Sequence, residues 1–168
     1  MEPLEILTSP VIPQEGFVHG FPTRRGGVSV GRRASLNLGY RWGDDPENVH
    51  ENRRRVALAA GFDVAHLQVT KHVHGTNVWV AGDELLEGAE FDGMVSTRPG
   101  DTLGAFAADC IPIVFADPVA RAVATAHAGH VREPGDRLFQ PLVGGSRPLP
   151  GHLSGGPRLR IRRIQPGP

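Results

Sequence analysis

The sequence has one cysteine, no long apolar run and no net charge, and each of these features argues against a class of protein. A single cysteine, Cys110, cannot form an intramolecular disulfide, which argues against a disulfide-rich secreted domain and suits a reducing compartment. No apolar run is long enough to cross a membrane, and no secretory leader is recognisable behind the acidic N-terminus. The 18 basic and 18 acidic residues cancel, so no overall attraction to nucleic acid or an anionic membrane is expected.

The length and the uneven composition predict one folded domain followed by a tail. A chain of 168 residues is long enough for one buried core, and its 22 glycines and 15 prolines disfavour a helical bundle. Through residue 130 there are 11 basic and 16 acidic residues, whereas the remaining 38 positions hold 7 basic and 2 acidic ones. We therefore expect a domain over residues 1–130 and a disordered Gly/Pro/Arg-rich tail over residues 131–168.

One strong helix is predicted over residues 45–60. Asp45 can cap it, Pro46 suits the first helical position, and Gly61 is a typical end signal. The expected apolar stripe consists of Val49, Val56, Ala57, Ala59 and Ala60.

Short β-like runs occupy most of the remaining domain. One precedes the helix at residues 17–21, and the others follow it at residues 67–73, 77–80, 93–96, 103–107, 111–116 and 122–126. One helix with several strands predicts an α+β (mixed α/β) fold centred on a sheet. The glycine-rich turn over residues 23–31 could form an anion-binding nest of backbone N–H groups.

Metal-binding side chains are the most informative polar residues of the sequence. Cys110 and four histidines near the ends of predicted strands, His72, His74, His127 and His130, are candidates. Their spacing is far wider than that of zinc fingers, so only the tertiary fold could assemble them. A buried thiol and hydrogen-bonded core histidines would account for the same residues without a metal.

Three local features favour a metal site. Small residues follow both His74 and His127, which allows a ligand or the backbone to approach closely. Asp109 precedes Cys110 in an otherwise apolar run, where a carboxylate needs a partner. One thiolate and two imidazoles would leave the fourth position of a tetrahedral zinc ion open, as in catalytic zinc sites.

Six ordered motifs between residues 17 and 129 resemble those of the YfiH/YlmD family. They are HGFPTRRGGVS (19–29), SLNLG (35–39), GDDPENV (43–49) with Asn52 and Arg53, VHGT (73–76), ADCIP (108–112) and AHAG (126–129). This family was once labelled multicopper polyphenol oxidoreductase or laccase domain and was later assigned to purine nucleoside metabolism. The resemblance implies a cytoplasmic zinc enzyme that phosphorolyses adenosine, inosine and 5′-methylthioadenosine and hydrolytically deaminates adenosine.

The resemblance also implies a set of site residues. The zinc ligands would be His74, Cys110 and His127. Purine nucleoside and phosphate would be the partners, with Arg53 and the turn that begins at Arg24 as candidates for binding phosphate.

Asn37 resembles a pocket position of the family that could hydrogen-bond substrate, and Arg53 and Asp109 are the catalytic candidates. Asp109 is the nearest acid/base to Cys110, although a structural ion pair with an arginine would explain it equally well.

Two departures from the family pattern stand out. His72 replaces the glutamine of Q-V-H-G and would share a strand face with His74, either competing for metal or lying exposed. After Gly129 the chain continues with His130 instead of the family's tryptophan, and the resemblance ends there, as in a truncated or frameshifted gene. We therefore expect an incomplete sheet with unpaired edges, which favours aggregation or a homo-oligomer.

Two alternatives belong to other functional classes. A copper-binding polyphenol oxidase is the first, because one cysteine and two histidines also suit copper. The second is a non-enzymatic remnant whose basic tail binds nucleic acid phosphates. No aromatic residue lies between the arginines of the segment LRIRRI (159–164), so base stacking is unsupported and a nucleic acid partner is not expected.

Overall fold

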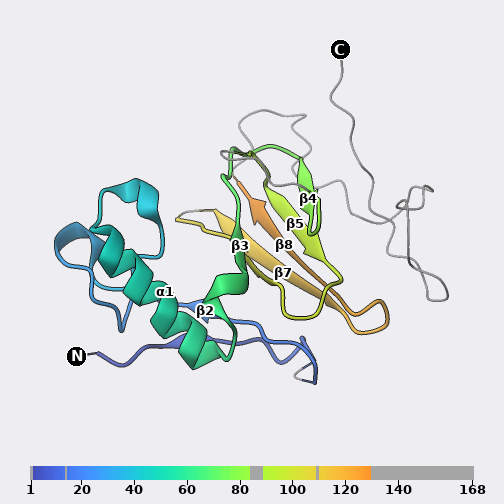
Figure 1. Ribbon diagram of the computed structural model, residues 1–168, viewed down its shortest axis with the longest axis horizontal. Coiled ribbons are helices and arrows are strands. Elements are labelled where there is room, and N and C mark those ends of the chain that lie inside the picture. Colours follow the sequence, from blue (N-terminus) through green and yellow to red (C-terminus); the bar gives the residue numbers. More distant parts are fainter. Residues whose placement is uncertain (1, 14, 84–88, 109, 130–168) are drawn as a thin grey trace, which may run out of the picture. The chain divides into compact units, whose positions relative to one another are not determined.

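A computed structural model of the chain describes residues 2–13, 15–83, 89–108 and 110–129 (Figure 1). The described residues form an α+β fold, which confirms the predicted class. The chain divides into two compact units, the first ending at Leu67 and the second beginning at Gln68. Asp109 and the tail predicted over residues 131–168 lie outside the described residues.

The first unit combines one long helix with short pieces of other secondary structure. In chain order these are β1 (Ile6–Leu7), β2 (Phe21–Pro22), the 3₁₀ helices η1 (Gly31–Arg33) and η2 (Tyr40–Trp42), α1 (Pro46–Ala60) and η3 (Val64–His66). The predicted strand over residues 17–21 is wrong except for Phe21, because its antiparallel partner β1 offers only two residues to pair with.

Helix α1 begins and ends where its capping residues predict. The side chain of Asp45 accepts the Glu47 N–H, and Gly61 at φ 79° donates its N–H to the Ala57 carbonyl. Its buried residues are Val49, Asn52, Val56 and Ala57. The predicted apolar stripe is therefore wrong at two positions, since Ala59 is exposed and Ala60 is half-buried. Within the described residues, no helix has the length and apolarity that a membrane span requires.

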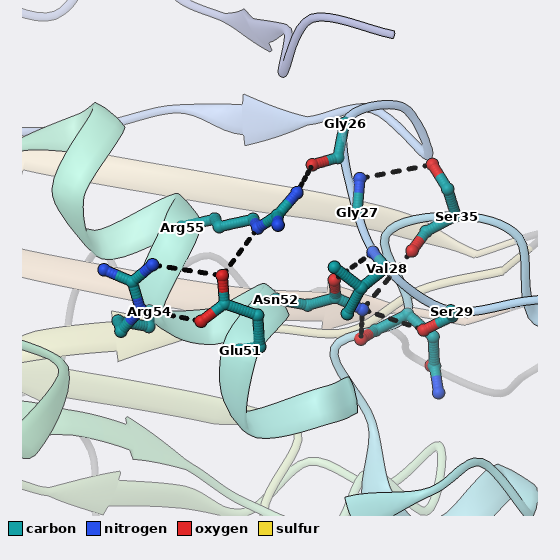
Figure 2. Close-up of polar contacts among 10 residues, drawn as sticks. Gly26, Gly27, Val28, Ser29, Ser35, Glu51, Asn52, Arg54 and Arg55 are labelled. Carbon is teal, nitrogen blue, oxygen red and sulfur yellow. Dashed lines mark hydrogen bonds and ion pairs between the residues drawn. The ribbon is translucent and has the colours of Figure 1, made fainter. Parts of the chain in front are cut away.

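Asn52, a buried polar residue of α1, ties the helix to the preceding loop (Figure 2). Its side chain is 0% exposed. The amide Nδ2 donates to Ser29 Oγ and to the Asn37 carbonyl, both at 2.8 Å, while Oδ1 accepts the Val28 N–H at 2.8 Å. Because every polar atom of this amide has a partner, Asn52 takes the place of an apolar residue on the buried face.

The second unit is built on strands. The two-stranded sheet pairs β3 (Leu67–Val69) with β6 (Thr102–Gly104). The four-stranded sheet has the order β4-β5-β8-β7 and consists of β4 (Val78–Val80), β5 (Gly93–Ser96), β8 (Ala122–Ala128) and β7 (Ile111–Asp117) (Figure 1). Strands β4 and β5 are parallel, and the other two pairs are antiparallel. The predicted strands exist, with β3 and β6 shorter than expected.

One face of the four-stranded sheet carries a small apolar core. Val95 and Ala124 are buried there, and Val78 and Val80 pack against them. Strand β7 ends the described order of this sheet. On β7, Ile111 is 65% and Phe115 is 38% exposed, so apolar surface continues onto this edge strand.

Candidate metal centre

The predicted metal ligands lie at one end of the four-stranded sheet. Strand β7 begins at Ile111, directly after Cys110, and pairs with β8, in which His127 is the last residue but one. His74 belongs to the loop between β3 and β4. Strand pairing therefore brings together residues that are far apart in the sequence.

The three side chains converge on a common point. His74 Nε2 lies 3.4 Å from Cys110 Sγ, and one donor atom from each of His74, Cys110 and His127 lies within 4.8 Å of the other two. His127 is 9% exposed, Cys110 is half-buried, and His74 is exposed. The cluster is thus anchored on the buried sheet and open to solvent beside His74.

The geometry of this cluster fits zinc. With Zn–N and Zn–S bonds of about 2.1 and 2.3 Å, a tetrahedral ion separates a nitrogen from a sulfur ligand by about 3.6 Å. The observed separation between His74 Nε2 and Cys110 Sγ is 3.4 Å. Two imidazoles and one thiolate also leave one tetrahedral position for a substrate or water. The described residues therefore fit a metal ion that keeps one position open.

Gly129 makes room for the ring of His74. A Cβ atom placed on Gly129 would lie 2.0 Å from His74 Cδ2 and 3.0 Å from its Nε2, far inside van der Waals contact. Only glycine is compatible with this position of the imidazole. The small residues after His127 thus allow a close approach, as predicted, and the approaching group is the ring of His74, the other candidate histidine ligand.

Asp92, which the sequence analysis did not single out, binds the ring of His127. Gly93 of β5 pairs with Ala126 of β8. Because these strands are antiparallel, the next residues along, Asp92 and His127, also lie opposite each other. His127 Nδ1 lies 2.8 Å from Asp92 Oδ1, and the His127 N–H donates to the Asp92 carbonyl at 2.7 Å. Because Nδ1 faces the carboxylate, Nε2 is the ring atom that His127 offers to a metal.

The same carboxylate accepts three consecutive backbone N–H groups from the loop that holds His74. The distances are 3.2 Å from Val73, 2.9 Å from His74 and 2.7 Å from Gly75. Burial alone would raise the pKa of Asp92, but hydrogen bonds from His127 and these backbone groups outweigh it and lower the pKa. Asp92 is therefore a buried anion whose charge is balanced by hydrogen bonds.

The expectation that His72 lies exposed is wrong, because its ring is half-buried. Competition for metal stays a prediction, since His72, Asp92 and His127 form a second group that could hold an ion. His72 Nδ1 lies 3.0 Å from the Phe91 carbonyl, and its Nε2 accepts the Phe106 N–H at 3.2 Å. The half-buried ring stacks on His127, with ring centroids 4.7 Å apart, and burial lowers the pKa of His72. Strand β3 ends at Val69, so the strand face that His72 was expected to share with His74 does not exist.

The predicted substrate-binding residues lie in the first unit. Nε and Nη2 of Arg24 donate to the Ala34 carbonyl. Asn37 Nδ2 donates to Asp44 at 2.9 Å, and Arg53 Nε donates to the Leu38 carbonyl at 2.8 Å. Their binding roles stay predictions.

In the glycine-rich turn over residues 23–31, four backbone N–H groups are not available for the expected anion nest. Those of Arg25, Gly27, Val28 and Ser29 already donate to acceptors within the first unit. These backbone groups therefore stabilise the turn itself.

A thiol and two imidazoles that converge at the end of a mixed sheet define an α+β protein with a candidate metal centre. Residues 18–132 match the family described as multi-copper polyphenol oxidoreductase laccase, and the chain belongs to this family. Among the described residues, a second group that could hold a metal ion consists of His72, Asp92 and His127, so it shares His127 with the first.

The chain is also similar to curated proteins named purine nucleoside phosphorylase. It is 47% identical over 129 residues to LACC1 of Mus musculus, covering 75% of this chain and 29% of that protein. It is 41% identical over 152 residues to a protein of Deinococcus radiodurans, covering 88% and 58%, and 38% identical over 124 residues to YfiH of Escherichia coli, covering 73% and 51%. The chain thus spans between about a third and somewhat more than half of these relatives' length.

Two solved structures show the same fold over the matched region. YlmD from Geobacillus stearothermophilus is 35% identical with a TM-score of 0.59, and the match covers 66% of this chain and 44% of that one. Protein NMB0706 from Neisseria meningitidis is 36% identical with a TM-score of 0.61, covering 75% and 50%.

Proposed function

We propose that this chain carries the zinc-binding part of a purine nucleoside phosphorylase. The observation that carries the proposal is the convergence of His74, Cys110 and His127 in a chain whose relatives are named for that activity. The proposed substrates are phosphate with adenosine, inosine or 5′-methylthioadenosine, and hydrolytic deamination of adenosine is a second proposed reaction. The proposed location is the cytoplasm, where a thiol such as Cys110 stays reduced.

In this proposal the zinc ion is held by His74 Nε2, Cys110 Sγ and His127 Nε2. When bound, it supplies a Lewis acid with one open position. Phosphorolysis joins a phosphate oxygen to ribose C1′ and breaks the bond from C1′ to the purine nitrogen. The leaving purine needs a proton, which we assign to Asp109.

Phosphate binding is assigned to Arg53, supported by Arg24, and nucleoside binding to Asn37. The Arg53 guanidinium is half-buried, lies 4.6 Å from the centroid of the Tyr40 ring, and is fixed by the Leu38 carbonyl. A cation held in this way loses little conformational entropy when it binds a phosphate.

The metal centre is tested before the reaction. Elemental mass spectrometry of the purified chain should find about one zinc per chain, and the Cys110→Ala variant should lose it. His72→Gln serves as the matched control, because both ring nitrogens of His72 are already hydrogen-bonded. Metal absent from all three proteins, or retained by Cys110→Ala, would contradict the proposed centre.

The reaction is tested by phosphate-dependent release of the base from inosine and 5′-methylthioadenosine. Arg53→Lys should raise the KM for phosphate, whereas Arg54→Lys should not, because Arg54 is exposed and paired with Glu51. A zinc-loaded chain that releases no base from any of these nucleosides would refute the proposed activity. Ammonia release from adenosine tests deamination separately.

The family description also suggests copper chemistry. Copper binds a Cys/His set more tightly than zinc does, so copper loading alone would not establish an oxidase. The test is oxidation of a phenol by the copper-loaded chain. A rate no higher than that of Cys110→Ala excludes this alternative.

We also propose that the chain self-associates through β7. This strand is the last in the described sheet order, and Ile111 on it is 65% exposed. An edge strand with an exposed apolar side chain favours pairing with a second copy. Light scattering that gives a monomer at all concentrations would refute this proposal.

A further inference from the structure

The carboxylate of Asp92 contacts both histidine ligands of the candidate metal centre. It is bound to the ring of His127 on one side and to the backbone of the His74 loop on the other. Asp92 is 5% exposed. This placement is unlike that of a surface carboxylate beside a metal, because solvent cannot replace either contact.

On the His74 side, Asp92 supports an uncommon backbone conformation. His74 has φ 60°, in the left-handed region that residues with a side chain rarely adopt. Such a conformation persists only where the surroundings fix it. Three successive N–H groups, from Val73 to Gly75, point at the Asp92 carboxylate, an arrangement that binds an anion and fixes the turn. The direction of the His74 side chain follows from this turn.

On the His127 side, Asp92 selects the ring tautomer. A carboxylate 2.8 Å from Nδ1 requires a proton on Nδ1, which leaves the Nε2 lone pair for a metal. The ring is also held from its face by His72, whose centroid lies 4.7 Å away. Both the orientation of this ring and the tautomer of its neutral form are therefore set before any ion binds.

We propose that Asp92 is a positioning residue that couples the two histidine ligands, so that one carboxylate prepares both for the same ion. The inference rests on the metal centre of the proposed function and goes beyond it by assigning the group that preorganises the ligands. A single change at Asp92 should disturb His74 and His127 together, although Asp92 provides no atom to the ion.

The experiment compares metal binding by the full chain with that of two carboxylate variants. Asp92→Asn keeps the size but turns an amide NH₂ toward backbone N–H groups, so one set of contacts must break. Asp101→Asn is the matched control, because Asp101 is another largely buried carboxylate of the same unit that accepts a hydrogen bond from Ser96 at 2.7 Å. Zinc affinity is measured by chelator competition and ligand geometry by cobalt(II) absorption.

We expect Asp92→Asn to bind zinc about 10–100-fold more weakly than wild type, and Asp101→Asn to bind normally. The cobalt spectrum of Asp92→Asn should keep its thiolate charge-transfer band, since Cys110 is untouched, but show altered d–d bands. Equal affinity and identical spectra for wild type and Asp92→Asn would overturn the positioning role alone. If the wild-type chain binds neither ion, the metal centre and this inference both fail.

A second measurement does not depend on a variant that must fold. Long-range ¹H–¹⁵N NMR of the metal-free wild-type chain reports which nitrogen of His127 carries the proton. For the neutral ring, a protonated Nδ1 and a bare Nε2 are expected. A proton on Nε2 with a bare Nδ1 would contradict the proposed role of Asp92, whatever the affinities are.

Discussion

Replacing Gly129 with alanine should disrupt metal binding through a purely steric effect on His74. The added Cβ would lie 2.0 Å from His74 Cδ2, whereas ordinary contacts of this kind begin at 3.4 Å. The imidazole must therefore move by more than an ångström, and a metal site tolerates displacements of only about 0.5 Å. Because the site would lose one well-placed ligand, we expect the zinc affinity to fall about 10–100-fold, the range reported for disturbed ligand support.

Gly75→Ala is the matched control, since it adds the same methyl group to the other glycine of the site. Its Cβ would lie 3.4 Å from Asp92 Oδ2 and 3.6 Å from Val73 Cγ2, which are ordinary contacts. Chelator competition on both variants measures the zinc affinity, and circular dichroism checks their folding. Unchanged affinity in Gly129→Ala, or an equal loss in both folded variants, would refute the steric reasoning.

Three further predictions concern other residues. Asn52→Ala should lower the free energy of unfolding in urea by about 2–4 kcal/mol, because buried partners lose their hydrogen bonds, while Asn48→Ala, with one 3.4 Å bond, should have a much smaller effect. Hydrogen bonds from Ser29 and then Asn37 lower the pKa of Asp44 below 3.8, so its ionised form stabilises the fold above that pH and the effect is lost as the pH falls further. The stability difference between wild type and Asp44→Ala should therefore shrink from pH 6 to pH 2 in urea unfolding, and a constant difference would contradict it. In His72→Gln, glutamine can donate to the Phe91 carbonyl and accept from Phe106, so one zinc per chain should be retained, and loss of zinc from this variant would make His72 a ligand.

Local signals in the sequence are sufficient for helix α1 but not for the strand limits. Asp45, Pro46 and Gly61 act within one turn of the helix ends, so their effect does not depend on the rest of the fold. The lengths of β2 and β3 depend on how many residues their partners offer, which no local pattern records. Asn52 was missed because a polar residue on a helix normally faces solvent, and its buried partners come from a distant loop.

For the site, the sequence could indicate the candidate metal ligands but not the residues that hold them in place. His74, Cys110 and His127 were assigned through the family resemblance, and the structure brings their donor atoms together. The role of Asp92 depends on the register between β5 and β8, which no local sequence pattern records. The only available sign was a lone carboxylate directly before the buried strand Gly93–Ser96. The exposure of His72 was misjudged because the chain leaves the strand before reaching it, and its ring accepts the Phe106 N–H.

A metal ion bound at this centre would stabilise the correct register between β5 and β8 over a slipped one. Side chains alternate between the faces of a sheet, so a slip of one residue would put Asp92 and His127 on opposite faces. A sheet with the slipped register could keep its backbone hydrogen bonds, but its metal centre would bind the ion poorly. Zinc at 100 times its Kd would favour the correct pairing by about 2.7 kcal/mol, which is a large share of the stability of a small domain.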